Sequence, residues 1–429
     1  MGQTVSRRRL LQGSVAGAVV LGFDLRTRSW VTEASASPGH AGIPSLVGQL
    51  LTDEATKAAF GDDFGHIVHR TPFAVLKPGS VQDIVKMVKF ARRHGLKVAM
   101  RGHGHSCLGQ AQAEGGIIVD SEVLNTIHRI DGDAAVVDPG VSWAQLLAAT
   151  LAQGLTPPVL TDFQELTVGG TLSVGGLGGT THRHGLQIDQ VLQLQVVTGR
   201  GDKVVCSPRV RPDLFNAVLA GLGQCGIIVR ATVKLVPAPT HAQAYSLYYD
   251  DLDAYVRDQE TLLAQRRFEY LQGQVVPNAS GSGWRYMVEA VSYFTPPAAP
   301  DATALLAGLS DDVASRQVAL HTYQAWQHRL DAGLAFLRQV GLWDLPHPWL
   351  TVYVPSSRVR DYIAPFIANL TPADTGMGPV LLYPVNTAPM NRPLYPLPAE
   401  SVAWHLSILR TASDAASLQA MLASNRALY

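Results

Sequence analysis

The stretch KVAMRGHGHSCLGQ occupies residues 97–110 and decides the fold of the first half of the chain. It starts as a short apolar strand and continues into a loop with several glycines, two histidines and a serine. Glycine at this density lets the backbone approach a ligand closely, with N–H groups directed at phosphate oxygens. The loop therefore indicates a site for an extended, phosphate-bearing ligand.

The residues on either side of this stretch predict a β-α-β unit. AVLKP (residues 74–78) and GIIVD (residues 116–120) are β-prone. Between them, VQDIVKMVKFARRHG (residues 81–95) has the apolar spacing of an amphipathic helix that Ser80 can cap. We expect the glycine-rich loop to follow the second strand of this unit.

A second glycine cluster, TDFQELTVGGTLSVGGLGG, lies in a Gly/Thr/Ser-rich segment that we interpret as one long loop over residues 157–185. It lacks the Lys-Ser/Thr ending of a P-loop. Together, the two loops can line one extended ligand. Asp162 is the only Asp of the cluster, and in a dry pocket its raised pKa would suit a general base. An Asx-turn or a surface position is the structural alternative.

The literal G-x-G-x-x-G pattern lies elsewhere, at residues 221–226. A helical pattern precedes it and a strand pattern follows it, which is the reverse of the order in a Rossmann fingerprint. It therefore indicates a helix-to-strand turn and argues against a nicotinamide dinucleotide fold.

The length and composition of the chain indicate the number of domains and the kind of partner to expect. A chain of 429 residues is long enough for two or three domains, and 47% hydrophobic with 16% charged residues is typical of a packed globular protein. Lys plus Arg equals Asp plus Glu at 34 each, and no basic run follows the first ten residues. This balance argues against nucleic-acid binding and favours a small neutral or apolar substrate.

Residues 1–36 predict an export signal. Arginines at positions 7–9 precede an apolar run over residues 14–23, and Ala-Ser-Ala at 34–36 offers a cleavage site. The run is shorter than the roughly 20 residues that span a bilayer, so no stable membrane anchor is expected. Ser-Arg-Arg-x-Leu-Leu has the twin-arginine form, which predicts a periplasmic or extracellular protein. A myristoylation pattern over residues 1–6 competes but leaves the apolar run unexplained.

Two His-x-His pairs raise a metal-binding alternative. His103 and His105 are two residues apart, as are His182 and His184, and four imidazoles can hold zinc or copper. An exported metal- or ligand-binding protein without redox activity is therefore a hypothesis from a different class. No carboxylate or cysteine stands at ligand spacing beside the pairs, so we predict no metal site.

Several motifs in order resemble those of the cytokinin dehydrogenases, within the FAD-linked oxidases related to vanillyl-alcohol oxidase. They are RGHGHSCLGQAQAEGGIIVD, TDFQELTVGGTLSVGGLGG, HRHG, GLGQCGIIVRA and GPVLLYPVN, within residues 63–412. The resemblance implies an α+β fold with a PCMH-type FAD-binding domain over residues 46–239. It also implies a substrate (cap) domain of antiparallel sheet plus helices over residues 240–429. The sequence departs from the family in that we expect no segment by which relatives return to the FAD domain.

The resemblance implies FAD as cofactor, joined covalently to His105 through the 8α-methyl group of the flavin. The other implied cofactor-binding residues are Arg101, Gly102, His103, Gly104, Ser106, Gln110, Asp162, Thr167, Ser173, Leu177 and Ile228. Asp162 and Glu289 are the implied catalytic residues. Glu289, Asn386 and Met390 are the implied substrate-binding residues, with Met390 where the family more often has Trp. An outward charge on an alternating strand is the structural alternative for Glu289.

The activity that the resemblance implies is oxidative cleavage of N6-substituted adenines. Asp162 would accept the side-chain N–H proton while hydride leaves the adjacent carbon, and water would split the imine into adenine and an aldehyde. Oxygen or a quinone-like carrier would accept the electrons. An FAD-linked oxidase of a sugar, an alditol or another small alcohol is the alternative, and Met390 in place of Trp favours it.

Overall fold

The computed structural model describes residues 14–15, 18–24, 27–32, 41–278, 280–281, 283–376 and 378–429. The chain divides into two compact units that are discontinuous in sequence. The first unit comprises the described residues of Met1–Leu146, Gln164–Val174 and Val191–Lys234, and the second comprises those of Leu147–Phe163, Gly175–Gln190 and Leu235–Tyr429. The segment predicted as one long loop is thus shared between the two units.

In its described residues, the first unit contains two sheets together with several helices. Its elements are β1 (Ser14–Val15), β2 (Ala18–Asp24), β3 (Ser29–Thr32), β4 (Ala41–Gly42), β5 (Gln49–Leu51), α1 (Glu54–Phe60), β6 (Ala74–Lys77), α2 (Val81–Arg93), β7 (Val98–Arg101), β8 (Ile117–Asp120), β9 (Ile127–Asp131), β10 (Ala134–Val137), α4 (Val168–Val174), β12 (Val191–Val197), β13 (Lys203–Cys206), α6 (Pro212–Val218) and β14 (Ile227–Lys234). α3 (Trp143–Leu151) crosses the sequence boundary between the units.

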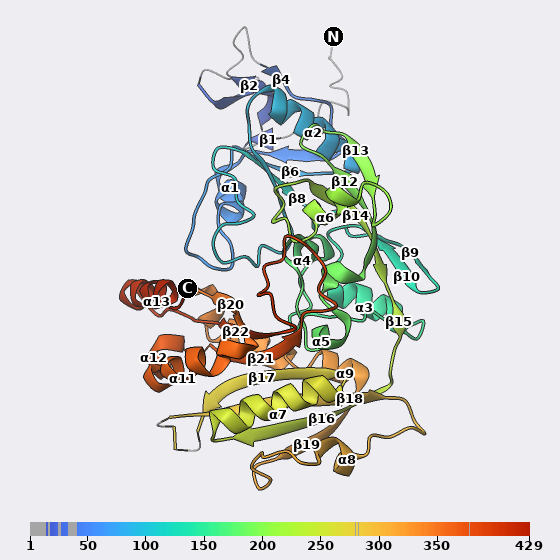
Figure 1. Cartoon of the computed structure of the whole chain (residues 1–429). Coiled ribbons are helices and arrows are strands. Elements are labelled where there is room, and N and C mark those ends of the chain that lie inside the picture. The colour runs from blue at the N-terminus through green and yellow to red at the C-terminus, as the bar shows by residue number, and fades with distance from the viewer. Residues whose placement is uncertain are drawn as a thin grey trace, which may run out of the picture. The chain divides into compact units, whose positions relative to one another are not determined.

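The predicted β-α-β unit is present in the first unit (Figure 1). β6, β8 and β7 are parallel neighbours, and α2 buries its apolar side in the same core cluster as strand residues such as Leu76 and Val119. β5 extends this sheet in the antiparallel direction, and a separate sheet has the antiparallel order β13-β12-β14-β10-β9. The glycine-rich loop follows β7, as predicted.

The expected capping role of Ser80 is wrong. Ser80 stands at the N-cap position of α2, but its side chain makes no capping hydrogen bond. Asp83 accepts instead from the backbone N–H groups of Val47, Gly48 and Gly79 at 2.8–3.0 Å. A fully buried carboxylate therefore ties the start of α2 to the residues just before β5 and to the turn that follows β6.

The prediction of an unbroken loop over residues 157–185 is also wrong. The segment contains the short helices α4 and α5 (Thr181–His184). α4 forms despite its glycines because Val168 and Leu172 are fully buried and Trp143 donates its indole N–H to Thr171 Oγ1 at 2.8 Å. Tertiary packing here overrides a composition that is poor for helices.

The second unit is built on one large antiparallel sheet of order β19-β16-β18-β17-β21-β22-β20. Its elements are β11 (Leu155–Thr156), α5, η2 (Gln187–Gln190), β15 (Val236–Pro237), β16 (His241–Tyr249), α7 (Leu252–Gln265), β17 (Tyr270–Pro277), β18 (Trp284–Phe294), α8 (Ala302–Leu306), β19 (Gln317–Thr322), α9 (Tyr323–Gln327), α10 (Asp331–Gln339), η3 (Leu342–Asp344), β20 (Leu350–Pro355), η4 (Ser356–Arg358), α11 (Val359–Asn369), α12 (Pro372–Thr375), β21 (Val380–Asn386), β22 (Val402–Ile408) and α13 (Ala415–Leu428).

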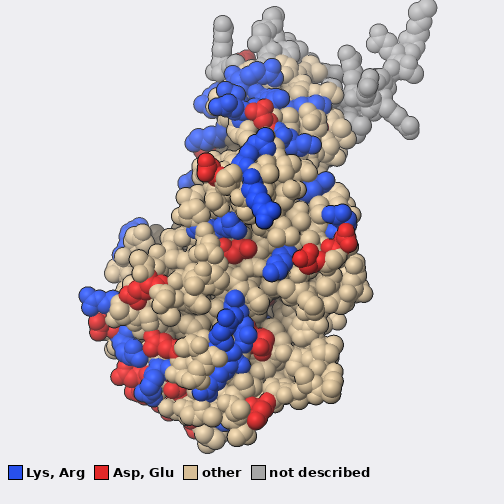
Figure 2. Space-filling view, turned by 45° about the vertical axis from the view of Figure 1, so that its right-hand side comes forward, with Lys and Arg blue, Asp and Glu red and all other residues tan. Residues whose placement is uncertain are grey.

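The core of the second unit lies between this sheet and α7, which runs along it in Figure 1. Asp251 caps α7 by accepting from the Ala254 N–H, and Tyr255 and Leu262 of α7 are buried against the strands. Figure 2 shows basic and acidic side chains mixed on the visible face of this unit. The α+β class and the sheet-rich cap domain are confirmed.

The apolar run assigned to an export signal is only partly described. Its residues 18–24 form β2, in which Phe23 is fully buried and contacts Trp30 edge to face. The arginines at positions 7–9 and the residues at 34–36 lie outside the described residues. Among the described residues, no helix has the length and apolar character needed to cross a bilayer.

Candidate active site

The first unit contains a pocket between the loop after β7, the segment of α4 and the turn before β14. Most of the predicted cofactor-binding residues line it, namely Gly102, His103, Gly104, His105, Ser106, Gln110, Thr167, Ser173 and Ile228. Residues that sequence reasoning missed complete the wall, among them Met100, Ala111, Ser121, Pro139, Leu166, Leu222, Gly223 and Gly226. The two glycine clusters therefore meet at one site, as predicted.

Glycine is required where segments of the pocket wall approach each other closely. A Cβ atom on Gly102 would stand 2.1 Å from Thr167 Oγ1, and one on Gly169 would stand 2.7 Å from Pro139 Cβ. Gly104 has a φ of +72°, which suits glycine. The N–H groups of Gly104 and Ser106 donate to no backbone carbonyl within the described part of the chain. A glycine cradle with available amide donors fits the pyrophosphate of FAD.

The segment of residues 62–66 holds the glycine-rich loop in place, and we call it the clasp. The Phe64 N–H donates to Gly104 O at 2.9 Å, and the Gly65 N–H donates to Ser106 O at 3.0 Å. The Phe64 ring lies against the His105 imidazole, with ring centroids 4.0 Å apart. The clasp therefore fixes both the backbone and the ring orientation of the residue predicted to carry the flavin.

Asp63 is the polar centre of the clasp. Its carboxylate accepts from Ser106 Oγ at 2.8 Å, from the Gly109 N–H at 2.7 Å and from the Gly65 N–H at 3.1 Å. The side chain is almost completely buried, and burial raises the pKa of Asp63 although these donors oppose the rise. Removal of the carboxylate would leave buried amide groups without an acceptor.

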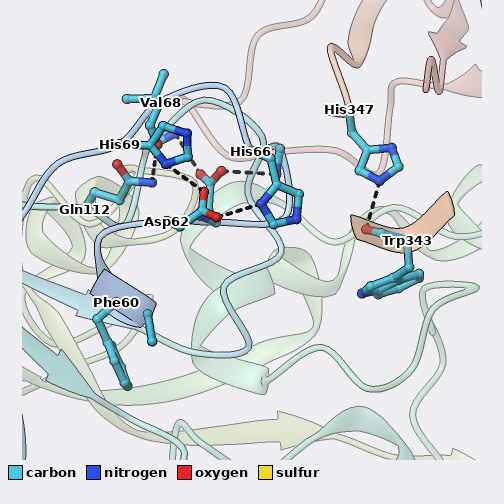
Figure 3. A network of polar contacts seen from close by, with 12 residues as sticks. Phe60, Asp62, His66, Val68, His69, Gln112, Trp343 and His347 are labelled. Carbon is cyan, nitrogen blue, oxygen red and sulfur yellow. Dashed lines mark hydrogen bonds and ion pairs between the residues drawn. The ribbon is translucent and has the colours of Figure 1, made fainter. Parts of the chain in front are cut away.

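Asp62, beside Asp63, has its carboxylate between two histidines (Figure 3). His66 Nδ1 lies 2.6 Å from Asp62 Oδ2, and His69 Nδ1 lies 3.2 Å from Asp62 Oδ1. Gln112 donates to the Val68 carbonyl at 2.8 Å in the same region. These contacts brace the outer side of the clasp.

The side chains of Arg101 and His103 each contact other groups of the protein. The Arg101 guanidinium donates to the carbonyls of Phe60 and Asp62 at the end of α1 and lies over the Phe60 ring. Arg101 thus supports the loop from outside. His103 lines the pocket, with Nδ1 3.2 Å from Glu122 Oε1 and Nε2 3.8 Å from Glu165 Oε2.

The G-x-G-x-x-G segment is a helix-to-strand turn between α6 and β14, as predicted. Ala220 and Leu222 have φ values of +58° and +51°, in the left-handed region that non-glycine residues rarely occupy. Their N–H groups donate to Leu172 O at 3.1 Å and Ser173 O at 2.9 Å, at the end of α4. The strain serves to place the turn against the pocket. The repeated glycines of residues 221–226 were the sequence signal from which this part of the pocket wall could have been predicted.

The second unit contains a cluster of charged groups around Asp162. Tyr270 Oη and Arg329 Nη2 donate to Asp162 Oδ1 at 3.0 and 2.9 Å, and Gln272 Nε2 donates to Oδ2 at 2.9 Å. Arg329 Nη2 also donates to Glu289 Oε2 at 3.2 Å. The two carboxylates predicted from distant parts of the sequence therefore share one guanidinium.

Neighbouring strands position these side chains. Gln272 on β17 stands opposite Glu289 on β18, and Tyr270 begins β17. Burial raises the pKa of Glu289, with the charge of Asp162 adding to the rise and Arg329 opposing it. Glu289 therefore points into the cluster, and the alternative of an outward surface charge is wrong. Sequence reasoning missed Arg329, Tyr270 and Gln272.

Two residues predicted to bind substrate make no hydrogen bond to this cluster within the described part of the chain, and Leu177, predicted to bind the cofactor, does not line the pocket of the first unit. Asn386 ends β21, and its side-chain oxygen accepts from the Ala388 N–H at 3.1 Å. Met390 is buried in the turn that follows, with its N–H donating to Thr387 O. Leu177 is half-buried in the second unit. Their predicted roles stay predictions.

His182, from the second His-x-His pair, has an imidazole that lies between two backbone carbonyl groups. His182 is buried, with Nδ1 2.9 Å from Gly179 O and Nε2 3.1 Å from Phe268 O, and burial lowers its pKa to about 4. Among the described residues, no group of three or more His, Cys, Asp or Glu side chains is arranged to hold a metal ion. His182 therefore has a structural position inside the second unit.

Comparison with known proteins gives two family matches. The FAD binding domain family matches residues 72–207. The family described as cytokinin dehydrogenase 1, FAD and cytokinin binding matches residues 283–429. The first match covers the β-α-β unit and its pocket loops, and the second covers Glu289 and Arg329.

Relatives that match most of the chain support both matches. An uncharacterized oxidoreductase, ORF5 of the fasciation locus in Rhodococcoides fascians, is 39% identical over 378 residues, which cover 88% of this chain and 86% of that protein. Cytokinin dehydrogenase 6 of Oryza sativa subsp. japonica is 38% identical, covering 81% and 75%. Cytokinin dehydrogenase 3 of Arabidopsis thaliana is 34% identical, covering 86% and 77%. The chain belongs to the cytokinin dehydrogenase family of FAD-dependent oxidoreductases.

Proposed function

We propose that this protein oxidises N6-substituted adenines and releases adenine and an aldehyde. One observation carries the proposal: Asp162 and Glu289 share the Arg329 guanidinium, at 2.9 and 3.2 Å. This arrangement places a carboxylate that can act as a base beside a second carboxyl group. A secondary amine and a purine ring nitrogen are groups that such a pair can bind.

Asp162 accepts the proton of the side-chain N–H in this proposal. Its carboxylate is oriented by Tyr270, Gln272 and Arg329, which together occupy both oxygens from the protein side. A base that is fixed in this way loses little entropy when the substrate N–H approaches. Loss of the N–H proton and of hydride from the adjacent carbon gives an imine, and water then cleaves it.

Glu289 binds the adenine ring in this proposal. Because burial raises its pKa, the carboxyl group retains a proton at a higher pH than an ordinary Glu. A protonated carboxyl can donate to a ring nitrogen, and an ionised one can accept from a ring N–H. Asn386 and Met390 are proposed to contact the substrate beside it.

The pocket of the first unit would hold FAD, and His105 would be its point of covalent attachment. Bound FAD supplies the acceptor for the hydride that leaves the substrate carbon. The clasp residues Asp63 and Phe64 keep the attachment loop in register. Oxygen or a quinone-like carrier is the proposed final electron acceptor.

The first test is anaerobic titration of the purified protein with N6-isopentenyladenine while the visible flavin band is recorded. We expect the band to bleach. Asp162→Asn should retain flavin and slow the bleaching roughly 100- to 10,000-fold, because the base is lost. Asp361→Asn, an exposed carboxylate of the same unit, should bleach like the unchanged protein.

A yellow protein that resists bleaching by N6-isopentenyladenine would contradict the proposed substrate and favour a sugar, an alditol or another small alcohol. A colourless protein would contradict the flavoenzyme. Covalent attachment has a separate test: flavin fluorescence should migrate with the chain on a denaturing gel and disappear in His105→Ala.

We also propose export by the twin-arginine route. The twin-arginine motif at residues 7–9 supports export. Cleavage after residue 36 would remove β2 and β3, including the buried Phe23, from the exported protein. N-terminal peptide mapping of protein recovered outside the cytoplasm tests the proposal. A peptide that starts at residue 37 supports cleavage, and recovery of the chain only from the cytoplasm contradicts export.

A further inference from the structure

Arg329 follows α9 and lies at the centre of the carboxylate cluster. Its Nη2 atom donates to Asp162 Oδ1 at 2.9 Å, to Glu289 Oε2 at 3.2 Å and to Tyr270 Oη at 2.5 Å. Its side chain is 15% exposed. A cation with little access to water interacts more strongly with neighbouring charges than a surface cation does.

Aromatic rings fix the guanidinium in this position. Its Cζ atom lies 4.2 Å from the ring centroid of Trp326 and 5.1 Å from that of Tyr270. Trp326 is itself held by a hydrogen bond from its indole N–H to Tyr293 Oη at 3.1 Å. A planar, weakly hydrated cation between rings is well suited to remain in place when substrate enters.

The other titratable groups that face the two carboxylates in the described structure are tyrosines. Tyr270 contacts Asp162 directly, Tyr383 lies near the same carboxylate, and Tyr293 lies near Arg329. Burial raises the pKa of all three phenols, so they stay neutral. In the described structure, the positive charge on this carboxylate pair comes from Arg329.

Two carboxylates at one site without a cation cannot both ionise readily, because the second charge is repelled by the first. The pair would then titrate in two steps, and the second proton would leave at a higher pH than from an isolated carboxyl group. A base that carries this proton cannot accept another from the substrate. A guanidinium that contacts both carboxylates offsets the repulsion between their negative charges.

We propose that Arg329 is a positioning residue that keeps Asp162 in its carboxylate form and aligns it with Glu289. The inference rests on the proposed function, in which Asp162 is the base. Arg329 acts through the two carboxylates and takes no proton itself.

The test compares the pH profiles of kcat/KM for three arginine variants with that of the unchanged protein. Arg329→Met removes the charge and keeps the length of the side chain, and Arg329→Lys keeps the charge without the planar fork. Arg316→Met is the matched control, because Arg316 pairs with the buried Asp311 at 2.7 Å elsewhere in the second unit.

We expect the acid limb of Arg329→Met to move upward by roughly one pH unit or more. At pH values below the limb, activity should then fall roughly 10-fold for each unit of the shift, and it should recover above the new limb. Arg329→Lys should keep most of the original profile. Arg316→Met should lower stability without moving the limb. A uniform loss at every pH in Arg329→Met, with the limb in place, would overturn the proposal.

A double variant separates charge from damage to the fold. Glu289→Gln combined with Arg329→Met leaves Asp162 as the remaining carboxylate of the pair, so its acid limb should return toward lower pH. A limb that stays at the position found in Arg329→Met would contradict the inference, because repulsion between carboxylates would not be the cause.

Thermal unfolding tests the inference independently of activity. If no N6-substituted adenine is oxidised, that result refutes the proposed function, and the unfolding measurement still tests the role of Arg329. In Arg329→Met, both half-buried carboxylates must ionise without a cation as pH rises, so its melting temperature should fall relative to that of the Arg329→Met, Glu289→Gln double variant. Parallel curves for the two variants would overturn the role of Arg329.

Discussion

Gly102 shows how one missing side chain lets two segments of the first-unit pocket approach each other closely. A Cβ atom there would stand 2.1 Å from Thr167 Oγ1, far inside van der Waals contact. Thr167 cannot retreat easily, because it is buried and its Oγ1 also accepts from the Gly170 N–H at 3.3 Å. The two glycine clusters are therefore matched to each other at this point.

Gly102→Ala should lower the flavin-to-protein ratio, measured by absorbance, and destabilise the chain by about 1–3 kcal/mol through overpacking. Thr167→Ala in the same chain removes the clashing oxygen and should restore part of the flavin. Gly199→Ala is a control, because a Cβ atom at that position would have no neighbouring atom within 4 Å. Full flavin content in Gly102→Ala would refute the steric account.

At the scale of single residues, the sequence predicted the site residues that belong to recognisable motifs. It missed the residues that only the tertiary structure brings to the site. Asp162 and Glu289 were predicted and do meet. Arg329 was missed because it lies in a polar helical run, where an arginine is most often a solvated charge. Only the pairing of β17 with β18 and the position of α9 bring the guanidinium to both carboxylates.

Among the elements, the clasp shows how a short irregular segment positions a functional loop. Its backbone pairs with residues 104–106, and Asp63 satisfies three donors of the clasp and the loop. Gly65 is required in the clasp, because a Cβ atom there would stand 2.0 Å from Cys107 O. The loop and the clasp therefore order each other.

Asp63→Ala should reduce flavin content and stability together. Loss of the carboxylate leaves buried donors unsatisfied, at a cost of about 1–3 kcal/mol for each such group. Absorbance of the purified protein and denaturant unfolding measure the two effects. Asp62→Asn is the neighbouring control, because it keeps a side-chain acceptor and leaves the contacts of Asp63 unchanged. Equal losses in both variants would contradict a specific role for Asp63.

Regular elements were predictable because their periodic patterns are local. The β-α-β unit, the turn at residues 221–226 and the long strand β18 agree with the sequence. α4 was missed because its glycines favour a loop, while the contacts that stabilise it come from Trp143 and from the turn before β14. The clasp has no periodic pattern at all.

At the scale of the whole molecule, the pH dependence of stability should come largely from buried histidines in the second unit. His405 is buried between Tyr353 and Tyr383, and its Nδ1 has no hydrogen-bond partner among the described residues. Burial lowers the pKa of His405 to about 3 and that of His182 to about 4. Both side chains are therefore neutral in the folded protein at mildly acid pH.

Stability should consequently fall as pH decreases from about 6.5 toward 3, because the unfolded chain binds protons that the folded chain excludes. Each histidine contributes up to about 1.4 kcal/mol per pH unit in this range. His405→Leu removes one such group, so its unfolding free energy should fall less steeply between pH 6.5 and 3 than that of the unchanged protein. Denaturant unfolding at a series of pH values measures the slope. An unchanged slope in His405→Leu would mean that the imidazole gains a proton within the folded core, which would require water to reach a site that the structure shows closed.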